Sequence, residues 1–377
     1  MLPSDVQIIS VDDHVIEPAN VFQDRLSAKH RELGPKVVRD DQGRDVWMFE
    51  NRPHYNIGLN AVAGKNRADY GIDPVGYDGM REGCYDITAR IKDMDADGVH
   101  AQLCFPTFPG FAGSTLFAAE DKDLANACVS AWNDWILDEW CAGAPGRQIP
   151  LALVPYWDAD ACVTEIERVA ARGSRGISFI EAPHNAGLPS FHTDHWDGVF
   201  AAAAAADMPL CMHFGSGGAP SIAPGGPFTA AIALFALNSQ STLVEMVNSR
   251  MFEKSPNLKV ALSEGGIGWM PYLLERVDYV WDRHRLYTGM ADSRKPSDIF
   301  RDHIFGCFIS DEAGVANIDR IGEDNVMFES DYPHSDSNWP NARKLLEETL
   351  ANVPDDRARK IAETNARRLY NFPRLDG

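Results

Sequence analysis

Short apolar stretches rich in β-branched and aromatic residues recur along the chain, and segments with helical spacing separate most of them. Apolar stretches bounded by polar or turn-forming residues are typical of buried strands. Eight strands are predicted in this way, at Gln7–Val11, Val99–Phe105, Ile149–Val154, Gly176–Ile180, Pro209–Met212, Lys259–Leu262, Ile304–Ile309 and Val326–Phe328. The seventh, in the segment HIFGCFIS, is the weakest, because it also fits a loop.

Apolar residues spaced three and four apart predict amphipathic helices between these strands. The clearest helices are predicted at Asp121–Trp140, Ala159–Arg172, His195–Ala206, Ser241–Phe252, Pro271–His284 and Asp355–Tyr370. Eight strands with intervening helices favour a closed (β/α)₈ TIM barrel over an open sheet. No G-x-G-x-x-G follows the first strand, so a dinucleotide-binding fold is not indicated. We therefore predict an α/β protein with a single barrel domain over residues 1–377.

Two stretches depart from this alternation of strands and helices. Residues 19–90 separate the first two strands and are rich in Gly, Asp, Asn and Tyr, so we interpret them as an insertion folded over the barrel mouth. Residues 217–240 form a Gly- and Pro-rich loop followed by an apolar segment. A loop of this length is typical of an active-site lid or of a subunit contact.

The acidic composition limits the classes of partner that the protein can have. The chain of 377 residues carries 55 acidic and 35 basic residues, a formal net charge of −20. Such a surface repels phosphate backbones, so nucleic-acid binding is not expected. The longest apolar runs, such as Phe200–Ala206, are too short to span a bilayer, so we expect no membrane partner. A small-molecule substrate is the expected partner.

The cysteines and the N-terminal sequence favour a cytoplasmic location. Seven cysteines are scattered along the chain without a C-x-x-C pair, which is typical of reduced and mostly buried thiols. The first residues contain no basic segment followed by an apolar one, so no signal peptide is predicted.

Polar residues at the predicted strand ends are the candidates for chemistry, because a TIM barrel places its active site at the carboxyl ends of its strands. Asp12 and His14 are two apart on an extended segment, so their side chains share one face. His213 follows the fifth strand, and Asp331 follows the eighth. Two imidazoles and two carboxylates form a mixed ligand set that suits Zn²⁺, and also Mn²⁺ or Fe²⁺.

Each of these residues also has an ordinary explanation. A lone histidine at a strand end is more often a hydrogen-bonded core residue, and a lone aspartate before a helix is more often an N-cap. Taken singly, Asp12 and Glu181, which follows the fourth strand, favour such an explanation. Ordinary explanations for all four residues on strands one, five and eight would require several coincidences at once. A metal site is therefore predicted.

Five segments, VDDHVIEP, PLCMHFGS, ALSEGGIGWMPY, FESDYPHSD and NARRLYNF, resemble the amidohydrolase-related family. The branch concerned holds aminocarboxymuconate-semialdehyde decarboxylase and the γ-resorcylate and 5-carboxyvanillate decarboxylases. The resemblance extends from Asp12 to Phe372 and implies that Asp12, His14, His213 and Asp331 bind one divalent metal. We expect Zn²⁺ there, with Mn²⁺ or Fe²⁺ as alternatives. The resemblance also implies a homodimer or a homotetramer.

The sixth strand departs from the pattern of the decarboxylases that this chain resembles. Those enzymes usually carry a histidine before a glycine at this position, whereas this chain has Glu264 in S-E-G-G. Glu264 is therefore a candidate for a further metal ligand or for a general base. Glu181 occupies the place of the residue that bridges two metals in binuclear members of the superfamily. One metal is the preferred interpretation, because the first motif is not His-x-His.

The function expected from these residues is metal-dependent hydrolysis of a small amide, lactone or related carbonyl substrate. A divalent ion lowers the pKa of bound water to about 7. Asp331 is then the candidate general base, Glu264 a proton shuttle and His213 a ligand at the reacting centre. The alternative is non-oxidative decarboxylation of a small aromatic or unsaturated acid, in which Asp331 delivers a proton to carbon.

Substrate contacts are harder to place from sequence. Trp269 and Phe214 follow the catalytic strands and are candidates to face an apolar substrate, although large aromatics are equally typical of the core. Arg276 is similar in spacing to an arginine that binds a substrate carboxylate in the neighbouring subunit of the picolinate-pathway decarboxylase; a surface salt bridge explains it equally well. His334 and His184 are candidates to orient other site residues.

Overall fold

A computed structural model describes residues 2–374, and its parallel strands surround a single central axis. The first sheet has the strand order β1-β5-β6 and the second the order β12-β11-β10-β9-β8-β7. The strands are β1 (Ile9–Val15), β5 (Ala101–Pro106), β6 (Gln148–Ile149), β7 (Leu151–Leu153), β8 (Gly176–Ser178), β9 (Leu210–His213), β10 (Val260–Ser263), β11 (Ile304–Phe308) and β12 (Val326–Phe328). All of these strands pair in parallel.

The two sheets together form one closed α/β barrel, as predicted. Between β6 and β7 lies Pro150, which has no N–H to offer a sheet ladder. At the other junction, the Asp331 N–H donates to the Asp12 carbonyl at 2.9 Å. The His14 N–H donates to the Tyr332 carbonyl at 2.7 Å. These two backbone bonds close the barrel between β1 and the segment after β12, and they hold three predicted metal ligands at the seam.

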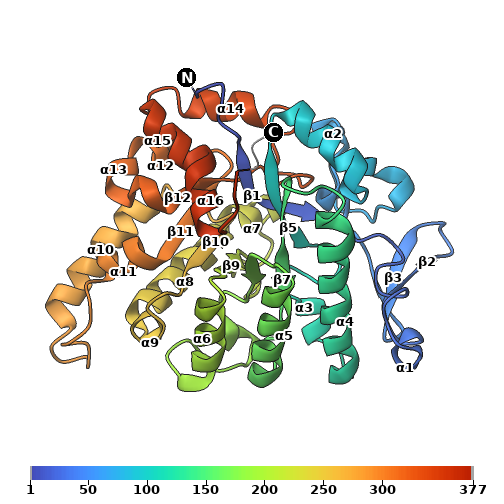
Figure 1. Cartoon of the computed structure of the whole chain (residues 1–377), viewed down its shortest axis with the longest axis horizontal. Helices are drawn as coiled ribbons and strands as arrows, with labels where there is room; N and C mark the ends of the chain where they lie inside the picture. Colours follow the sequence, from blue (N-terminus) through green and yellow to red (C-terminus); the bar gives the residue numbers. More distant parts are fainter. Residues whose placement is uncertain (1, 375–377) are drawn as a thin grey trace.

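Helices cover the outside of the barrel (Figure 1). The longer ones are α2 (Ile87–Asp97), α4 (Lys122–Trp135), α5 (Ala159–Ala171), α6 (Asp197–Ala205), α8 (Ala236–Asn248), α10 (Met270–His284), α11 (Pro296–His303) and α14 (Ala342–Thr349). The shorter ones are α1 (Ala28–Arg31), α3 (Ser114–Phe117), α7 (Phe228–Leu234), α9 (Met251–Lys254), α12 (Glu312–Ala316), α13 (Ile318–Ile321), α15 (Asp355–Arg359) and α16 (Asn365–Leu369). Several begin at an aspartate N-cap, such as Asp121, which accepts the Leu124 N–H.

The interior of the barrel is filled by apolar side chains from alternate positions of the strands, including Val11, Leu103 and Phe305. Tyr370, at the end of the C-terminal helical segment, is fully buried against this layer. Its hydroxyl lies 3.5 Å from the Cys211 thiol. The filled interior is therefore a packed floor, and it leaves the carboxyl ends of the strands as the place for chemistry.

The insertion between β1 and β5 contains an antiparallel sheet of β2 (Lys36–Arg39), β3 (Asp45–Phe49) and β4 (Arg52–His54). This sheet lies at the edge of the molecule in Figure 1. Trp47 of β3 stacks on Phe108, the second residue after β5, with ring centroids 4.7 Å apart. The insertion is thus packed onto the barrel through aromatic side chains.

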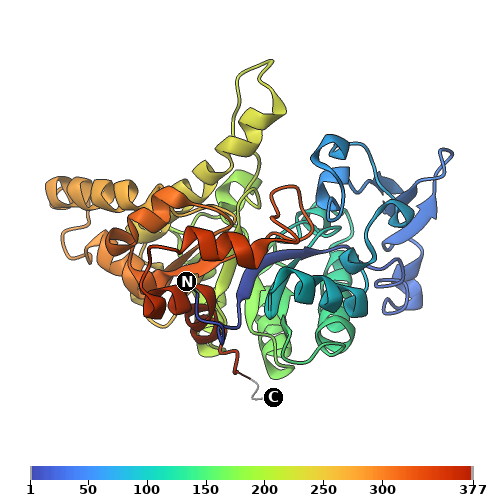
Figure 2. The ribbon, with the colours of Figure 1, turned by 90° about the horizontal axis from the view of Figure 1, so that it is seen from above.

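Residues 217–240 include α7 and the start of α8, and they project from the body of the protein (Figure 2). No residue of α7 is buried. Among the described residues, the run Phe228–Asn248 is long and apolar enough to cross a membrane by length and composition alone. Its second half packs on the barrel instead, because Leu243, Met246 and Val247 are buried in the core. The expectation of no membrane partner remains a prediction.

Candidate metal centre

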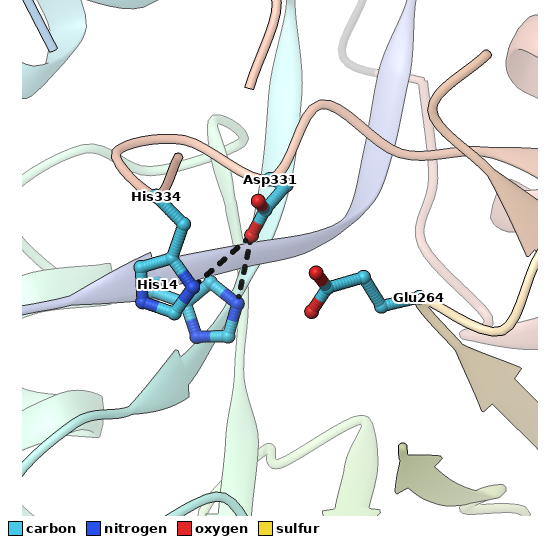
Figure 3. A group of neighbouring side chains, drawn as sticks. All are labelled: His14, Glu264, Asp331 and His334. Atoms are coloured by element: carbon cyan, nitrogen blue, oxygen red, sulfur yellow. Dashed lines mark ion pairs between the residues drawn. The ribbon is translucent and has the colours of Figure 1, made fainter. Parts of the chain in front are cut away.

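The predicted ligands come together at the carboxyl ends of the strands. Asp12, His14 and His213 each offer one donor atom, and these atoms lie within 4.8 Å of one another. A second group with the same spacing contains His14, Glu264, Asp331 and His334. Figure 3 shows the imidazoles of His14 and His334 next to each other, with one oxygen of Asp331 paired to both and Glu264 reaching toward them from another side. His14 belongs to both groups, and we call the two groups together the ligand cluster; the predicted ligands His213 and Asp331 belong to different groups.

Close approaches link the members of this cluster. His14 Nε2 lies 3.1 Å from Asp331 Oδ1 and 3.4 Å from Asp12 Oδ1. His213 Nε2 lies 2.8 Å from Glu264 Oε2 and 3.7 Å from Asp12 Oδ2. His334 stacks on His14 with ring centroids 3.5 Å apart.

Most polar atoms of the cluster have no hydrogen-bond partner among the described residues. Both carboxylate oxygens of Asp12 and of Asp331 are in this state, as are both ring nitrogens of His14 and Nε2 of His213. A buried polar atom without a partner costs about 1–3 kcal/mol, and more when it is charged. A divalent cation would take one donor atom from each side chain of a ligand group, which would satisfy several of these buried oxygens and nitrogens.

The tautomer of His213 is set by its own backbone. Its Nδ1 lies 2.7 Å from the Phe214 carbonyl oxygen, so Nδ1 carries the proton and donates it to that oxygen. Nε2 then has a free lone pair at the cluster, as a metal ligand requires.

Electrostatics in the cluster also favour a bound cation. Burial, together with the charges of Glu329 and Glu264, raises the pKa of Asp12 well above its ordinary value. Burial and the charge of Asp331 likewise raise the pKa of Glu264. Burial and the neighbouring histidine rings lower the pKa of His14 well below its ordinary value, so this imidazole is neutral. A divalent ion would neutralise the crowded carboxylates and accept the neutral imidazoles as ligands.

Two of the acidic residues occupy the left-handed region of backbone conformation. The φ angle is 57° at Glu264 and 56° at Asp331, a region that residues other than glycine rarely adopt. The Glu264 N–H donates to Glu329 Oε2 at 3.0 Å, which helps to hold this conformation. Such backbone strain typically occurs where surrounding structure fixes a functional side chain.

Several residues that support the cluster were not identified from the sequence. Glu329 lies two residues before Asp331, and the same two-residue spacing that singled out Asp12 and His14 would have found it. Asp13 accepts hydrogen bonds from the Ser330 hydroxyl at 2.5 Å and from the Tyr332 N–H at 2.9 Å.

Two further supporting residues have no sequence signal of their own. The buried guanidinium of Arg90 donates to the His14 carbonyl at 2.7 Å. The ring of Phe111 stacks on His213 with centroids 3.7 Å apart. Both residues come from parts of the chain whose position beside the cluster cannot be predicted from the order of strands and helices.

The remaining predicted site residues lie outside the cluster. Glu181 is buried, but it accepts the Gly215 N–H at 3.0 Å and belongs to neither ligand group. Trp269 donates from Nε1 to the Gly265 carbonyl and packs against the core. Phe214 stacks on Phe235 of the 217–240 segment. Arg276 is exposed on α10, with its guanidinium 5.4 Å from the Tyr279 ring centroid.

His184 is likewise exposed, on a short turn after β8. All seven cysteines are free and buried, as the sequence predicted.

Comparison with known proteins identifies the family to which this site belongs. A family model described as Amidohydrolase matches residues 53–372. The γ-resorcylate decarboxylase of Rhizobium sp. strain MTP-10005 is 26% identical over 319 residues, which cover 76% of this chain and 87% of that protein.

Solved structures share the fold over nearly the whole chain. An amidohydrolase from Mycobacterium avium subsp. paratuberculosis K-10 has a TM-score of 0.73 and 21% identity, covering 98% of this chain and 100% of that one. The 5-carboxyvanillate decarboxylase of Novosphingobium aromaticivorans, complexed with manganese and 4-hydroxy-3-methoxy-5-nitrobenzoic acid, has a TM-score of 0.68 and 20% identity, covering 97% of this chain and 96% of that one. With the family model matching most of its length, the chain belongs to the amidohydrolase family of enzymes.

Proposed function

We propose that this enzyme is a metal-dependent decarboxylase that removes CO₂ from a small aromatic hydroxy acid. The observation that carries the proposal is the buried ligand cluster around His14, in a chain whose curated relatives are γ-resorcylate decarboxylases. Hydrolysis, which the sequence favoured, is less well supported, because these relatives are carboxy-lyases. Decarboxylation, the alternative from sequence, is therefore preferred.

Asp12, His14, His213 and Asp331 would hold the metal, with Glu264 as a fifth candidate ligand. When bound, a divalent ion supplies positive charge that stabilises oxygen anions of the substrate. The carboxylates among these residues suit Mn²⁺, and manganese is bound in a similar decarboxylase structure. We therefore propose Mn²⁺ ahead of the Zn²⁺ that the sequence favoured.

Asp331 is the residue placed to move the proton. Its Oδ1 lies 3.1 Å from His14 Nε2 and 3.3 Å from His334 Nδ1, so its carboxylate adjoins both a candidate metal ligand and a histidine that can exchange a proton with it. Asp331 would deliver that proton to the ring carbon that bears the carboxyl group. The bond between this carbon and the carboxyl carbon then breaks, its electron pair stays with the ring, and CO₂ leaves.

His334 is placed to restore the proton on Asp331. Its Nδ1 lies 3.3 Å from Asp331 Oδ1. Burial lowers the pKa of His334, but the negative charges of Asp331 and Glu264 outweigh burial and raise it. A histidine here offers the imidazole that the sixth strand lacks, since that strand ends in Glu264.

The test uses purified protein supplied with Mn²⁺ during expression and a panel of hydroxybenzoic acids that includes γ-resorcylate and 5-carboxyvanillate. We expect about one equivalent of metal per chain and release of CO₂ together with the matching phenol. Asp331→Asn should lower turnover by at least about 100-fold, the scale of a lost proton-transfer group. The exposed Asp282 on α10 provides the control, because Asp282→Asn makes the same chemical change away from the site.

Two results would contradict the proposal. The first is hydrolysis of amides or lactones by a metal-loaded protein that releases no CO₂ from any acid in the panel. The second is full decarboxylase activity in the Asp331→Asn variant, which would remove this residue from the mechanism.

A further inference from the structure

The segments that carry the candidate ligands meet where the barrel has no β ladder. β1 contains Asp12 and His14, and Asp331 follows β12, but β1 and β12 belong to different sheets. The register of β1 with its other neighbour, β5, also shifts between Ser10 and Asp13. Such an irregularity re-aims the side chains of a strand and locally interrupts the ladder that holds them. Contacts other than a ladder therefore fix the separation of the two ligand segments.

One of these contacts is made by a buried arginine. Arg90 of α2 is fully buried, and its Nη2 donates to the His14 carbonyl at 2.7 Å. Its Nε donates to the Gly83 carbonyl, near the end of the insertion, at 2.6 Å. The guanidinium lies over the rings of Tyr332 and Trp140, 4.3 Å and 5.1 Å from their centroids. A single side chain thus contacts β1, the insertion and the segment after β12.

Hydrogen bonds to backbone, rather than an ion pair, hold this guanidinium. In the described part of the chain, no carboxylate lies within ion-pair distance of Arg90, whereas Arg81 binds both oxygens of Asp93 at 2.7 Å. A buried charge is costly unless its donors are hydrogen-bonded. Arginine offers several N–H donors in a rigid planar fork, so the positions of the carbonyls and of the fork determine each other.

Tyr332 connects Arg90 to the segment that carries Asp331. The Tyr332 carbonyl accepts the His14 N–H at 2.7 Å, and its own N–H donates to Asp13 Oδ1 at 2.9 Å. Its hydroxyl donates to Asp93 Oδ2 at 2.6 Å. Both the N–H and the carbonyl of His14 are therefore bonded, and the residue after Asp331 is fixed at three polar atoms.

We infer that Arg90 is a positioning residue of the metal centre. Through the His14 carbonyl and the Tyr332 ring it sets how His14 and Asp331 present their donor atoms to the ion. The inference rests on the proposed function for the metal, whereas the contacts of Arg90 do not depend on which reaction follows. Removal of partners that orient metal ligands typically weakens metal binding by about 10–100-fold.

The test compares two variants of Arg90 with one control. Arg90→Met removes every donor at similar length, and Arg90→Lys keeps the charge but not the fork. The control is Asn325→Ala at the amino end of β12, because the buried Asn325 amide also donates to backbone carbonyls, those of Arg301 and Ile304 at 2.9 Å. Calorimetry on the metal-free full-length chain would measure Mn²⁺ affinity, and electron paramagnetic resonance would report the surroundings of the bound ion.

We expect Arg90→Met to weaken Mn²⁺ binding by about tenfold or more and to change the resonance of the bound ion. Arg90→Lys should weaken binding by about threefold or more, because one ammonium cannot span both carbonyls in the same geometry. Asn325→Ala should lower the urea midpoint of unfolding, yet bind Mn²⁺ within about twofold of the wild type. If Arg90→Met does not fold, the lysine variant decides, and its unchanged affinity would overturn the inference.

Binding and turnover separate this inference from the proposed function. If both Arg90 variants bind Mn²⁺ as the wild type does while the wild type releases CO₂, the positioning role is wrong and the decarboxylase proposal stands. An equal loss of affinity in Asn325→Ala also overturns the positioning role, because general loss of stability would then explain it. If affinity depends on Arg90 but no acid of the panel loses CO₂, the positioning role stands and the decarboxylase proposal is wrong. A wild type that binds no Mn²⁺ overturns both.

Discussion

The insertion of residues 19–90 and the segment of residues 217–240 both follow carboxyl ends of barrel strands, yet β3 of the first buries its aromatic side chains and the second exposes several of its apolar ones. Trp47 and Phe49 of the insertion are each less than 5% exposed. In the second segment, Phe228 is 52% exposed and Leu237 is 48% exposed. The insertion therefore forms a fixed wall beside the ligand cluster, whereas the segment contributes surface that this chain does not cover.

Different anchors secure the two segments. Glu17, at the root of the insertion, accepts N–H groups from Thr107, Phe108 and Trp132 at 2.8–3.0 Å. Glu181 holds the two flanks of the 217–240 segment, because its side chain accepts the Gly215 N–H and its carbonyl accepts the Thr242 hydroxyl. The difference teaches that the fixed insertion is suited to selecting a substrate. The 217–240 segment is suited to contacting another subunit or to closing over the site.

The largest expected effect is on the anchor of the insertion. Glu17→Ala should lower the free energy of unfolding by about 3–5 kcal/mol, because three buried N–H donors lose their acceptor at about 1–3 kcal/mol each. Glu17→Gln keeps one carbonyl oxygen and should lose roughly half as much. Urea denaturation followed by circular dichroism measures both. A loss below about 1 kcal/mol in the alanine variant would show that the insertion is held by its aromatic packing instead.

The anchor of the 217–240 segment should make stability depend on pH. Burial raises the pKa of Glu181 to about 8, from an ordinary value of 4.5. Between these two values the folded protein keeps the proton while the unfolded chain releases it, so stability falls as pH rises. The slope for one proton is at most about 1.4 kcal/mol per pH unit. Glu181→Gln cannot titrate and should reduce the difference in unfolding free energy between pH 5 and pH 8; burial also raises the pKa of Asp13 and Glu17 to about 7, so part of the difference should remain.

Urea denaturation at several pH values compares this variant with the wild type. Equal slopes in the two proteins would mean that Glu181 is ionised in the folded state. That outcome would revive its candidacy as a metal ligand, since a bound cation would keep the carboxylate charged.

The alternation of strands and helices made the barrel predictable, because each unit carries its own hydrophobic period. Even the weak seventh strand forms, as β11. The end of the first strand was misplaced, since Asp12 and His14 lie inside β1 rather than after it. Polar residues normally mark the end of a strand, but here they are fully buried in the ligand cluster. The pattern of apolar and polar residues does not show when polar residues are buried inside a strand.

The positions of the candidate ligands could be predicted from the sequence, whereas their surroundings could not. Strand ends in a closed barrel converge whatever the loops do, so His213 and Asp331 could each be placed at the barrel mouth from chain order alone, whereas their binding of a common ion stays a prediction. The contact of the Val62 N–H with the Pro333 carbonyl, at 2.9 Å, depends instead on how an insertion packs against a distant loop. Spacing also suggested a substrate role for Arg276, whereas its side chain is exposed on α10 and outside the cluster of its own chain.

A smaller effect is expected where the 217–240 segment meets the site. Phe235 stacks on Phe214 with ring centroids 4.8 Å apart, and Phe214 follows the predicted ligand His213. Phe235→Ala should cost about 1 kcal/mol of unfolding free energy, the scale of one aromatic pair that is partly exposed. Trp47→Ala in the insertion should cost about 3–5 kcal/mol, as for a buried core aromatic. If urea denaturation shows equal losses of unfolding free energy in the two variants, the two segments do not differ in how firmly they are packed.

The smallest effect on folding is expected at Phe228 in the 217–240 segment. Its substitution tests whether this segment is a subunit contact. Phe228→Ser should leave the free energy of unfolding of a chain within about 0.5 kcal/mol of the wild type, because the side chain is already half exposed. Ile222 and Leu237 of the same segment are also exposed, and several exposed apolar side chains in one segment are typical of a surface that another chain covers. We therefore predict that the wild type sediments as a homodimer or homotetramer and that Phe228→Ser yields a smaller species. The exposed Leu286, beyond α10, supplies a control in Leu286→Ser, which should keep the wild-type mass. If Phe228→Ser also keeps that mass, the segment is not the subunit contact, and its apolar face is left to act as a lid over the bound substrate.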